Sequence, residues 1–233
     1  MELGKVYLLP MLLHEEGMES LPKDVIVWIQ QCDAFFVENE KTARRYFKKL
    51  WKEMVIDNYT WQTIHKVENE QIQIFTQLLK QGKNIGILSE AGCAGIADPG
   101  QILVAAAQKL GAVVKPFVGP SSLLLALMGS GMNGQNFHFH GYLPIDAIER
   151  KKKIQALESE IKLTGGTQLF IETPYRNNQL FEALIQNCQN NTQLCVAMEL
   201  TSPNECIKTQ TIAHWKNNKP ELHKKLVVFL LGA

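Results

Sequence analysis

Residues 85–101 read IGILSEAGCAGIADPGQ, a composition typical of a ligand-binding loop. A strand-like apolar run ends at Leu88, three glycines follow, and Asp98-Pro99 then matches the N-cap and N1 positions of a helix. Since α/β proteins hold ligands at the carboxyl ends of strands, this pattern favours a binding loop; a tight turn without a ligand is the alternative. The spacing fits neither GxGxxG nor GxxxxGK(S/T), which argues against a dinucleotide or triphosphate site.

A second loop of small residues follows the next predicted strand. Gly119-Pro120-Ser121-Ser122 leads into an apolar helix predicted over residues 123–128. Ser121 or Ser122 can cap that helix, which is the more common role, or present a hydroxyl group to a ligand. Because two strand ends carry loops of this kind, we expect them to form one shared crevice.

Three charged residues stand where predicted strands end, a common place for catalytic groups. Glu38 closes the predicted strand 34–38, while Glu172 and Arg176 flank the turn 173–175. A carboxylate at such a position can accept a proton as a general base. An ion pair or a helix cap is the structural alternative for Glu172 and Arg176, and the same ambiguity applies to Glu38.

A helix predicted around Arg45 separates apolar from basic side chains. Six cations with no acid among them lie on one face: Lys41, Arg44, Arg45, Lys48, Lys49 and Lys52. Such a face could neutralise a run of phosphates. Solvated lysines are the alternative, since the opposite face, with Tyr46 and Phe47, already explains why the helix forms.

Metal ligands are not predicted. His138 and His140 alternate on one strand face, but no third ligand accompanies them at metal spacing, so a solvated face is the favoured interpretation. The five cysteines are scattered and without a CxxC pair: Cys32, Cys93, Cys188, Cys195 and Cys206. Neither a disulfide framework nor a zinc site follows, and buried thiols in a reducing cytoplasm are expected.

Overall composition excludes some classes of protein. The chain has 233 residues, 45% of them hydrophobic and 20% charged, as in ordinary folded proteins. Lys and Arg number 24 against 23 for Asp and Glu, so the net charge of +1 gives no global argument for nucleic-acid or membrane binding. The longest apolar runs, such as residues 226–231, are far shorter than the roughly 18 residues of a membrane span.

Short apolar runs alternate with amphipathic helical stretches, which predicts an α/β fold. Strands are expected at residues 6–9, 34–38, 85–88, 113–118, 137–142, 168–171, 194–199, 207–212 and 226–231. Helices are expected around Ile26, Arg45, Phe75, Val104 and Phe181, and over residues 147–163. A hairpin of strands 194–199 and 207–212 makes the second sheet mixed, while the first is mainly parallel. We place two lobes at residues 1–118 and 119–233, and the family resemblance described below implies a ligand cleft between them.

Five segments in this order carry a resemblance to a known family: SEAGCAGIADPG, GPSSLLLALMGSG, FHFHGYLP, LFIETPYR and VAMELT. The chain resembles the tetrapyrrole methylase-fold S-adenosylmethionine-dependent methyltransferases, and within them the branch that methylates the ribose 2′-hydroxyl of small-subunit ribosomal RNA. The resemblance implies two α/β domains, S-adenosylmethionine in the cleft, and a homodimer acting on ribosomal RNA or a ribosomal particle, with no membrane and no metal.

The resemblance also implies roles for individual residues. Cofactor contacts are expected from Pro10, Ser89, Glu90, Ala91, Gly92, Ile96, Ser121, Ile171, Ala197 and Met198. Met198 alone would more often be a core residue than a support for adenine. Glu38 and Glu172 are candidate general bases with Arg176 orienting a carboxylate or the substrate, and RNA contacts are expected from Arg44, Arg45 and Lys48.

Two alternatives stay open. The same fold methylates macrocycles, so the acceptor could be a tetrapyrrole or another small molecule. A non-catalytic RNA-binding relative is the second alternative, because Cys93 and Ala94 stand where the family usually has Thr-Pro.

Overall fold

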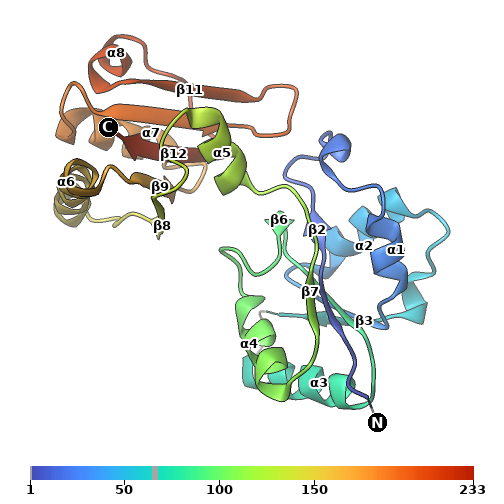
Figure 1. The fold of residues 1–233 in the computed structure, drawn as a ribbon. Coiled ribbons are helices and arrows are strands. Elements are labelled where there is room, and N and C mark those ends of the chain that lie inside the picture. Colours follow the sequence, from blue (N-terminus) through green and yellow to red (C-terminus); the bar gives the residue numbers. More distant parts are fainter. Residues whose placement is uncertain (1, 65–67) are drawn as a thin grey trace. The chain divides into compact units, whose positions relative to one another are not determined.

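The computed structural model describes residues 2–64 and 68–233 and confirms the α/β class. The contacts of the chain divide it into two units, Met1–Ser121 and Ser122–Ala233, which we call unit 1 and unit 2 (Figure 1). The expected domains, residues 1–118 and 119–233, remain a prediction. No helix in the described part of the chain is long and apolar enough to cross a membrane.

Unit 1 is built on a five-stranded parallel sheet with the order β4-β3-β5-β1-β7. Its strands are β1 (Val6–Leu8), β3 (Ala34–Val37), β4 (Thr60–Thr63), β5 (Ile85–Leu88) and β7 (Val114–Pro116). The remaining elements are β2 (Pro10–Met11), η1 (Met18–Ser20), α1 (Val25–Gln30), α2 (Glu40–Leu50), η2 (Ile56–Asn58), α3 (Glu68–Lys80), β6 (Gly92–Cys93) and α4 (Gln101–Leu110). The parallel first sheet is therefore confirmed.

Strand β3 shows why helices cover both faces of this sheet. Successive side chains of a strand point to opposite faces, and all four residues of β3 are buried. Phe35 packs against Phe47 of α2, with ring centroids 4.8 Å apart. Phe36 packs against Phe75 of α3 on the other face, at 5.2 Å. A strand buried on both faces must be apolar throughout, as this one is.

The elements outside the predicted set include strand β4 and helix α8. Strand β4 pairs with β3 at the edge of the sheet, but its sequence TWQT is half-exposed and mostly polar, so it has no apolar run to reveal it. Helix α8 (Ile212–Asn217) begins where a strand was expected to end, at the cap residue Thr211, whose side chain accepts a hydrogen bond from the N–H of His214. Both elements are short, and their places depend on contacts with distant residues.

Unit 2 contains a mixed five-stranded sheet with the order β11-β10-β12-β9-β8. Its strands are β8 (Phe137–Tyr142), β9 (Thr167–Ile171), β10 (Gln193–Met198), β11 (Cys206–Thr211) and β12 (Val227–Gly232). Its other helices are α5 (Ser122–Ser130), α6 (Ala147–Thr164) and α7 (Asn177–Asn187). Strands β8 and β9 are parallel and the remaining pairs antiparallel, so the predicted mixed sheet and the β10–β11 hairpin are confirmed.

Helix α6 and strand β9 meet in the core of unit 2. Asp146 caps the helix, because its carboxylate accepts hydrogen bonds from the N–H groups of Ile148 and Glu149. The helix ends at Gly165, whose φ of 65° belongs to the left-handed region that glycine adopts freely. Leu157 of this helix is fully buried with Phe170 of β9 in one cluster.

The cysteines correct one expectation. All five are free thiols, but only Cys32, Cys188 and Cys195 are buried. Cys93 and Cys206 are half-buried; Cys93 ends the two-residue strand β6, and Cys206 begins β11.

Candidate active site

The predicted site residues of unit 1 follow the carboxyl ends of four strands. Pro10 comes after β1, Glu38 after β3, residues 89–92 after β5, and Ser121 after β7. Since these strands are parallel, their carboxyl ends lie at one edge of the sheet. The sheet thus places at a single edge the loops that the sequence singled out.

A short antiparallel ribbon joins two of these loops. Strands β2 and β6 pair so that Pro10 stands opposite Cys93. The thiol of Cys93 donates to the carbonyl oxygen of Pro120, at 3.4 Å, and so connects the third loop. Gly92 has a φ of 74°, and a Cβ atom there would meet the Pro120 oxygen at 3.2 Å. A side chain at Gly92 would therefore be strained by its left-handed backbone and tight against the Pro120 oxygen.

Asp98 corrects the predicted start of the following helix. The helix α4 begins at Gln101, and its N-cap residue is Gly100, not Asp98. The Asp98 carboxylate instead accepts hydrogen bonds of 2.7 Å from the N–H groups of Gly95 and Gly100. Burial raises the pKa of Asp98, and these N–H donors oppose that rise. Asp98 therefore shapes the loop, whose backbone turns twice through positive φ, at Gly95 and Ala97.

Residues 89–91 are held in place at both ends. The buried Ser89 hydroxyl donates to the carbonyl oxygen of Ala91, at 3.0 Å. The N–H of Glu90 donates to Oε2 of Glu38, also at 3.0 Å. Glu90 and Ala91 are themselves exposed, as is Ile96. This arrangement leaves the side chain of Glu90 accessible while its backbone is tied to the end of β3.

A cavity of about 320 Å³ lies beside this loop, within unit 1. Its lining is mostly apolar and consists of Leu8, Cys93, Ala94, Gly95, Ile96, Gln101, Val104, Pro116 and Phe117. This volume falls at the lower end of the roughly 300–1,000 Å³ usual for small-molecule sites. Of the predicted cofactor residues, Ile96 lines it. Cys93 and Phe117 are the main additions; Cys93 lies within the first glycine loop, and Phe117 lies two residues before the second loop.

In unit 2 the predicted residues also gather at one sheet edge. Ile171 ends β9 and Ala197-Met198 end β10, and both strands run antiparallel to β12. Ile171 and Ala197 therefore flank the same residue of β12, Val228, from opposite sides. Ala197 is fully buried, and Met198 packs part of its side chain against the core of the unit and leaves the rest accessible.

Glu172 and Arg176 form an ion pair, which was the structural alternative to a catalytic role for these two residues. Oε1 of Glu172 accepts hydrogen bonds from Nη2 and Nε of Arg176, at 2.7 and 3.1 Å. The same oxygen accepts the N–H of Thr173 at 2.6 Å. The Glu172 side chain is 2% exposed and that of Arg176 31% exposed. The carboxylate is thus committed to holding the turn and the guanidinium, and the guanidinium is the accessible member of the pair.

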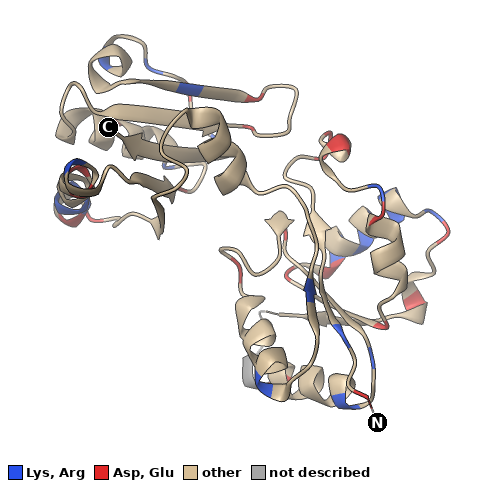
Figure 2. Cartoon of the chain, viewed as in Figure 1, with Lys and Arg blue, Asp and Glu red and all other residues tan. Residues whose placement is uncertain are grey.

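The basic helix α2 differs from its predicted form in two respects (Figure 2). It ends at Leu50, so Lys52 lies beyond it. An acid does belong to it, since Glu40 forms an ion pair with Arg44, whose guanidinium also lies 5.2 Å from the centre of the Trp61 ring. The ammonium of Lys48 donates to the carbonyl oxygen of Met54, at 3.0 Å. Arg45 is exposed. Part of the positive charge therefore stabilises the helix and the segment after it.

The two histidines of β8 are less solvated than expected. His138 is exposed, but His140 is half-buried. Burial lowers the pKa of His140, and the positive charge of Lys153 acts in the same direction. Glu160, 20 residues beyond His140 in the sequence, lies beside them on α6.

Comparison with known proteins adds two kinds of similarity. The family model described as "Tetrapyrrole (Corrin/Porphyrin) Methylases" matches residues 17–215. A relative from Vibrio cholerae serotype O1, named "Ribosomal RNA small subunit methyltransferase I", is 30% identical over 72% of this chain and 57% of its own. A relative of the same name from Bacillus subtilis strain 168 is 29% identical over 93% of this chain and 71% of its own.

The chain thus spans a little over half the length of the first of these relatives. Among solved structures, the methyltransferase CobJ superposes with a TM-score of 0.65 at 15% identity, over 100% of this chain and 94% of that one. Uroporphyrin-III-C-methyltransferase from Thermus thermophilus gives a TM-score of 0.58 at 15% identity, over 98% and 92%. At such identities the likeness concerns the fold.

Proposed function

The chain belongs to the tetrapyrrole methylase family, and on that premise we propose that it is an S-adenosylmethionine-dependent methyltransferase whose acceptor is a ribose 2′-hydroxyl of ribosomal RNA. The observation that carries the acceptor is the similarity to relatives named for methylation of small-subunit ribosomal RNA. The cytoplasm, where ribosomes assemble, is the proposed location, and ribosomal RNA or a ribosomal particle the proposed partner.

The residues of unit 1 fit a cofactor of this kind. The positive φ of Gly92 turns the loop that follows β5, and the neighbouring apolar cavity suits a nucleoside ring. The residues assigned to the cofactor are Pro10, Ser89, Glu90, Ala91, Gly92, Ile96 and Ser121, with Ile171, Ala197 and Met198 contributed by unit 2. S-adenosylmethionine supplies a methyl group already activated on a sulfonium, so the protein has to orient the acceptor, exclude water and take up a proton.

Glu38 is the better placed of the two candidate bases. Glu38 is half-exposed, and its carboxylate accepts the backbone N–H of Glu90, whereas Glu172 is buried and holds Arg176. We therefore assign proton acceptance to Glu38. Arg176, with its accessible guanidinium, would contact the substrate, and Glu172 would position it. Arg44, Arg45 and Lys48 would contact RNA phosphates.

Self-association is part of the proposal. Leu124 and Met128 of α5 are 52% and 78% exposed, an unusual state for large apolar side chains on one helix. A second copy of the chain would bury them, and a twofold pair would present two basic helices to one RNA. Sedimentation at micromolar concentration should therefore show a dimer, and a monomer throughout would contradict this part of the proposal.

The deciding experiment incubates the protein with S-adenosylmethionine labelled on the methyl group. Small ribosomal subunits, naked ribosomal RNA and uroporphyrinogen serve as separate acceptors. We expect label in RNA, recovered after nuclease digestion as one 2′-O-methylated nucleoside. Label in the macrocycle would replace the proposal by a tetrapyrrole methyltransferase. RNA binding without cofactor binding in calorimetry would replace it by a non-catalytic RNA-binding protein.

A further inference from the structure

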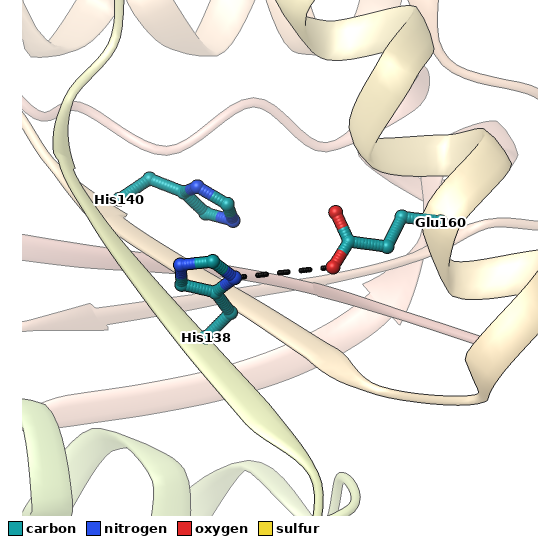
Figure 3. A group of neighbouring side chains, drawn as sticks. All are labelled: His138, His140 and Glu160. Atoms are coloured by element: carbon teal, nitrogen blue, oxygen red, sulfur yellow. Dashed lines mark ion pairs between the residues drawn. The ribbon is translucent and has the colours of Figure 1, made fainter.

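Two imidazoles and one carboxylate form a compact group in unit 2 that includes none of the residues assigned above. His138 and His140 of β8 and Glu160 of α6 each offer a ligand atom, and these atoms all lie within 4.8 Å of one another. Nδ1 of His138 is 3.9 Å from Oε1 of Glu160. The two imidazole rings stack, with centroids 4.3 Å apart (Figure 3).

The topology of unit 2 explains why these residues meet. Residues two apart on a strand project to the same face, so His138 and His140 share one. Strands β8 and β9 are parallel neighbours, and α6 is the crossover between them. A crossover helix must pack on one face of its sheet, and here that face is the one bearing both histidines. Glu160, 20 residues beyond His140 in sequence, is thereby carried back to them.

The orientation of His140 is set by a buried amide. Gln168 is 1% exposed, and its Nε2 donates to the carbonyl oxygen of Gly166 at 3.1 Å. That bond turns Oε1 of Gln168 toward His140, whose Nε2 lies 2.6 Å away. Metal-binding histidines characteristically have such a fixed oxygen partner, which holds the ring and adjusts its basicity. Gln168 is a positioning residue in this group.

We propose that His138, His140 and Glu160 bind a divalent transition-metal ion of the Zn²⁺ class. Two imidazoles and a carboxylate suit Zn²⁺ and its neighbours, whereas Mg²⁺ and Ca²⁺ require oxygen ligands. Bonds of about 2.1 Å would place tetrahedral ligand atoms about 3.4 Å apart. The side chains of His138 and Glu160 are 62% and 42% exposed, so they are free to close that distance.

A bound ion would join the edge strand β8 to the helix that covers it. Strand β8 pairs on one side, with β9, and the ion would give it a second attachment through α6. A ligand that binds the folded state and not the unfolded one raises the melting temperature, by roughly 5 °C when it is present at 100 times its Kd. Zn²⁺ should therefore stabilise the protein without being needed for methyl transfer.

Titration calorimetry of the untagged protein with ZnCl₂, beside MgCl₂, tests the proposal. We expect one Zn²⁺ per chain, no Mg²⁺ binding, and at least a tenfold loss of Zn²⁺ affinity in His138→Gln and Glu160→Gln. Both substituted side chains are partly exposed, so these variants should fold. His214→Gln removes an exposed histidine outside the group and serves as the matched control.

A second measurement separates this group from the cysteines. Co²⁺ bound by nitrogen and oxygen lacks the strong near-ultraviolet thiolate bands that it shows when bound by sulfur. Thiolate bands, an equal loss of affinity in His214→Gln, or an absence of Zn²⁺ binding at 100 μM would each overturn the proposal. Thermal melting completes the test, since Zn²⁺ should raise the melting temperature of the parent and of His214→Gln, and leave that of Glu160→Gln unchanged.

Discussion

The carboxylate of Glu38 accepts a hydrogen bond from the backbone N–H of Glu90, and so bridges the ends of two neighbouring strands, β3 and β5. Each of these residues had been singled out for a different reason, one as a base and the other as a cofactor contact. Their contact means that the position of the proposed base and the position of the glycine loop depend on each other. A substitution at Glu38 therefore has two separable effects, one on charge and one on loop geometry.

The variant Glu38→Gln should separate the effect on charge from the effect on loop geometry. The amide oxygen can still accept the N–H of Glu90, so the loop and the cofactor affinity should change little, while proton acceptance is lost. We expect single-turnover methyl transfer to fall by roughly 10²–10⁴-fold, the usual contribution of a general base. Glu38→Ala removes both functions and should weaken cofactor binding as well. Full activity in Glu38→Gln would exclude Glu38 as the base.

Gly92→Val should abolish cofactor binding and leave the chain folded. The φ of 74° and the contacts of 3.2 Å with Leu13 and with the Pro120 oxygen strain any side chain at this position. Backbone strain of this kind costs about 1–3 kcal/mol, less than the stability of a typical domain. Calorimetry with S-adenosylmethionine and circular dichroism check the two halves of the prediction. The control is Gly134→Val, because nothing lies within 4 Å of a Cβ atom there. Equal affinities of the two variants for S-adenosylmethionine would refute the placement of the cofactor at the loop of Gly92.

The triple variant Arg44→Gln, Arg45→Gln and Lys48→Gln should weaken RNA binding and flatten its dependence on salt. Each phosphate contact contributes about 0.7–0.9 to the slope of log K against log salt, so up to two or three units would be lost. The ion pair of Arg44 with Glu40 and the bond of Lys48 to Met54 go as well, which predicts a small drop in melting temperature. An equally charged control removes the exposed Lys109, Lys115 and Lys162. RNA affinity is measured for both triple variants across a salt series. Identical slopes of log K against log salt in the two variants would mean that the cations of α2 are ordinary solvated surface.

Stability should fall in alkaline solution through Cys188. Burial, followed by the nearby carboxylate of Glu158, raises the pKa of this thiol from 9.0 to about 12. Above pH 9 the unfolded chain therefore loses a proton that the folded chain retains, and unfolding is favoured until about pH 12. The cost is at most about 1.4 kcal/mol per pH unit in that window. In urea unfolding, the free energy of unfolding of Cys188→Ala should decline less steeply with rising pH than that of the parent. The control is Cys206→Ala, which removes a half-buried thiol and should decline as the parent does.

Much of unit 1 could be predicted from its sequence because the relevant interactions are local. Strands buried on both faces read as unbroken apolar runs, and Gly92 and Gly95 mark real turns through positive φ. Asp98 was misplaced because a carboxylate before a helix can serve the helix or the loop, and the sequence pattern is the same for both. The choice is decided by where the N–H groups of Gly95 and Gly100 point in the folded loop.

Contacts in the candidate site that join distant segments could not be predicted from the sequence. Glu172 and Arg176 are four residues apart, so their ion pair could be anticipated, whereas the bond from Glu90 to Glu38 and the approach of Glu160 to His138 join distant segments. Such contacts follow from strand order and helix crossover. No spacing in a single sequence reveals them.

The position of β1 in its sheet has a consequence for synthesis of the chain. β1 is synthesised before both of its neighbours in the sheet, β5 and β7, with Val6 opposite both Ile85 and Val114. Until β7 has left the ribosome, β1 lacks one of its flanking strands and its backbone groups on that side face water or other chains. Translation at about 5–20 residues per second leaves this apolar edge exposed for several seconds. Chaperone binding to nascent chains should therefore peak at lengths that end before β7.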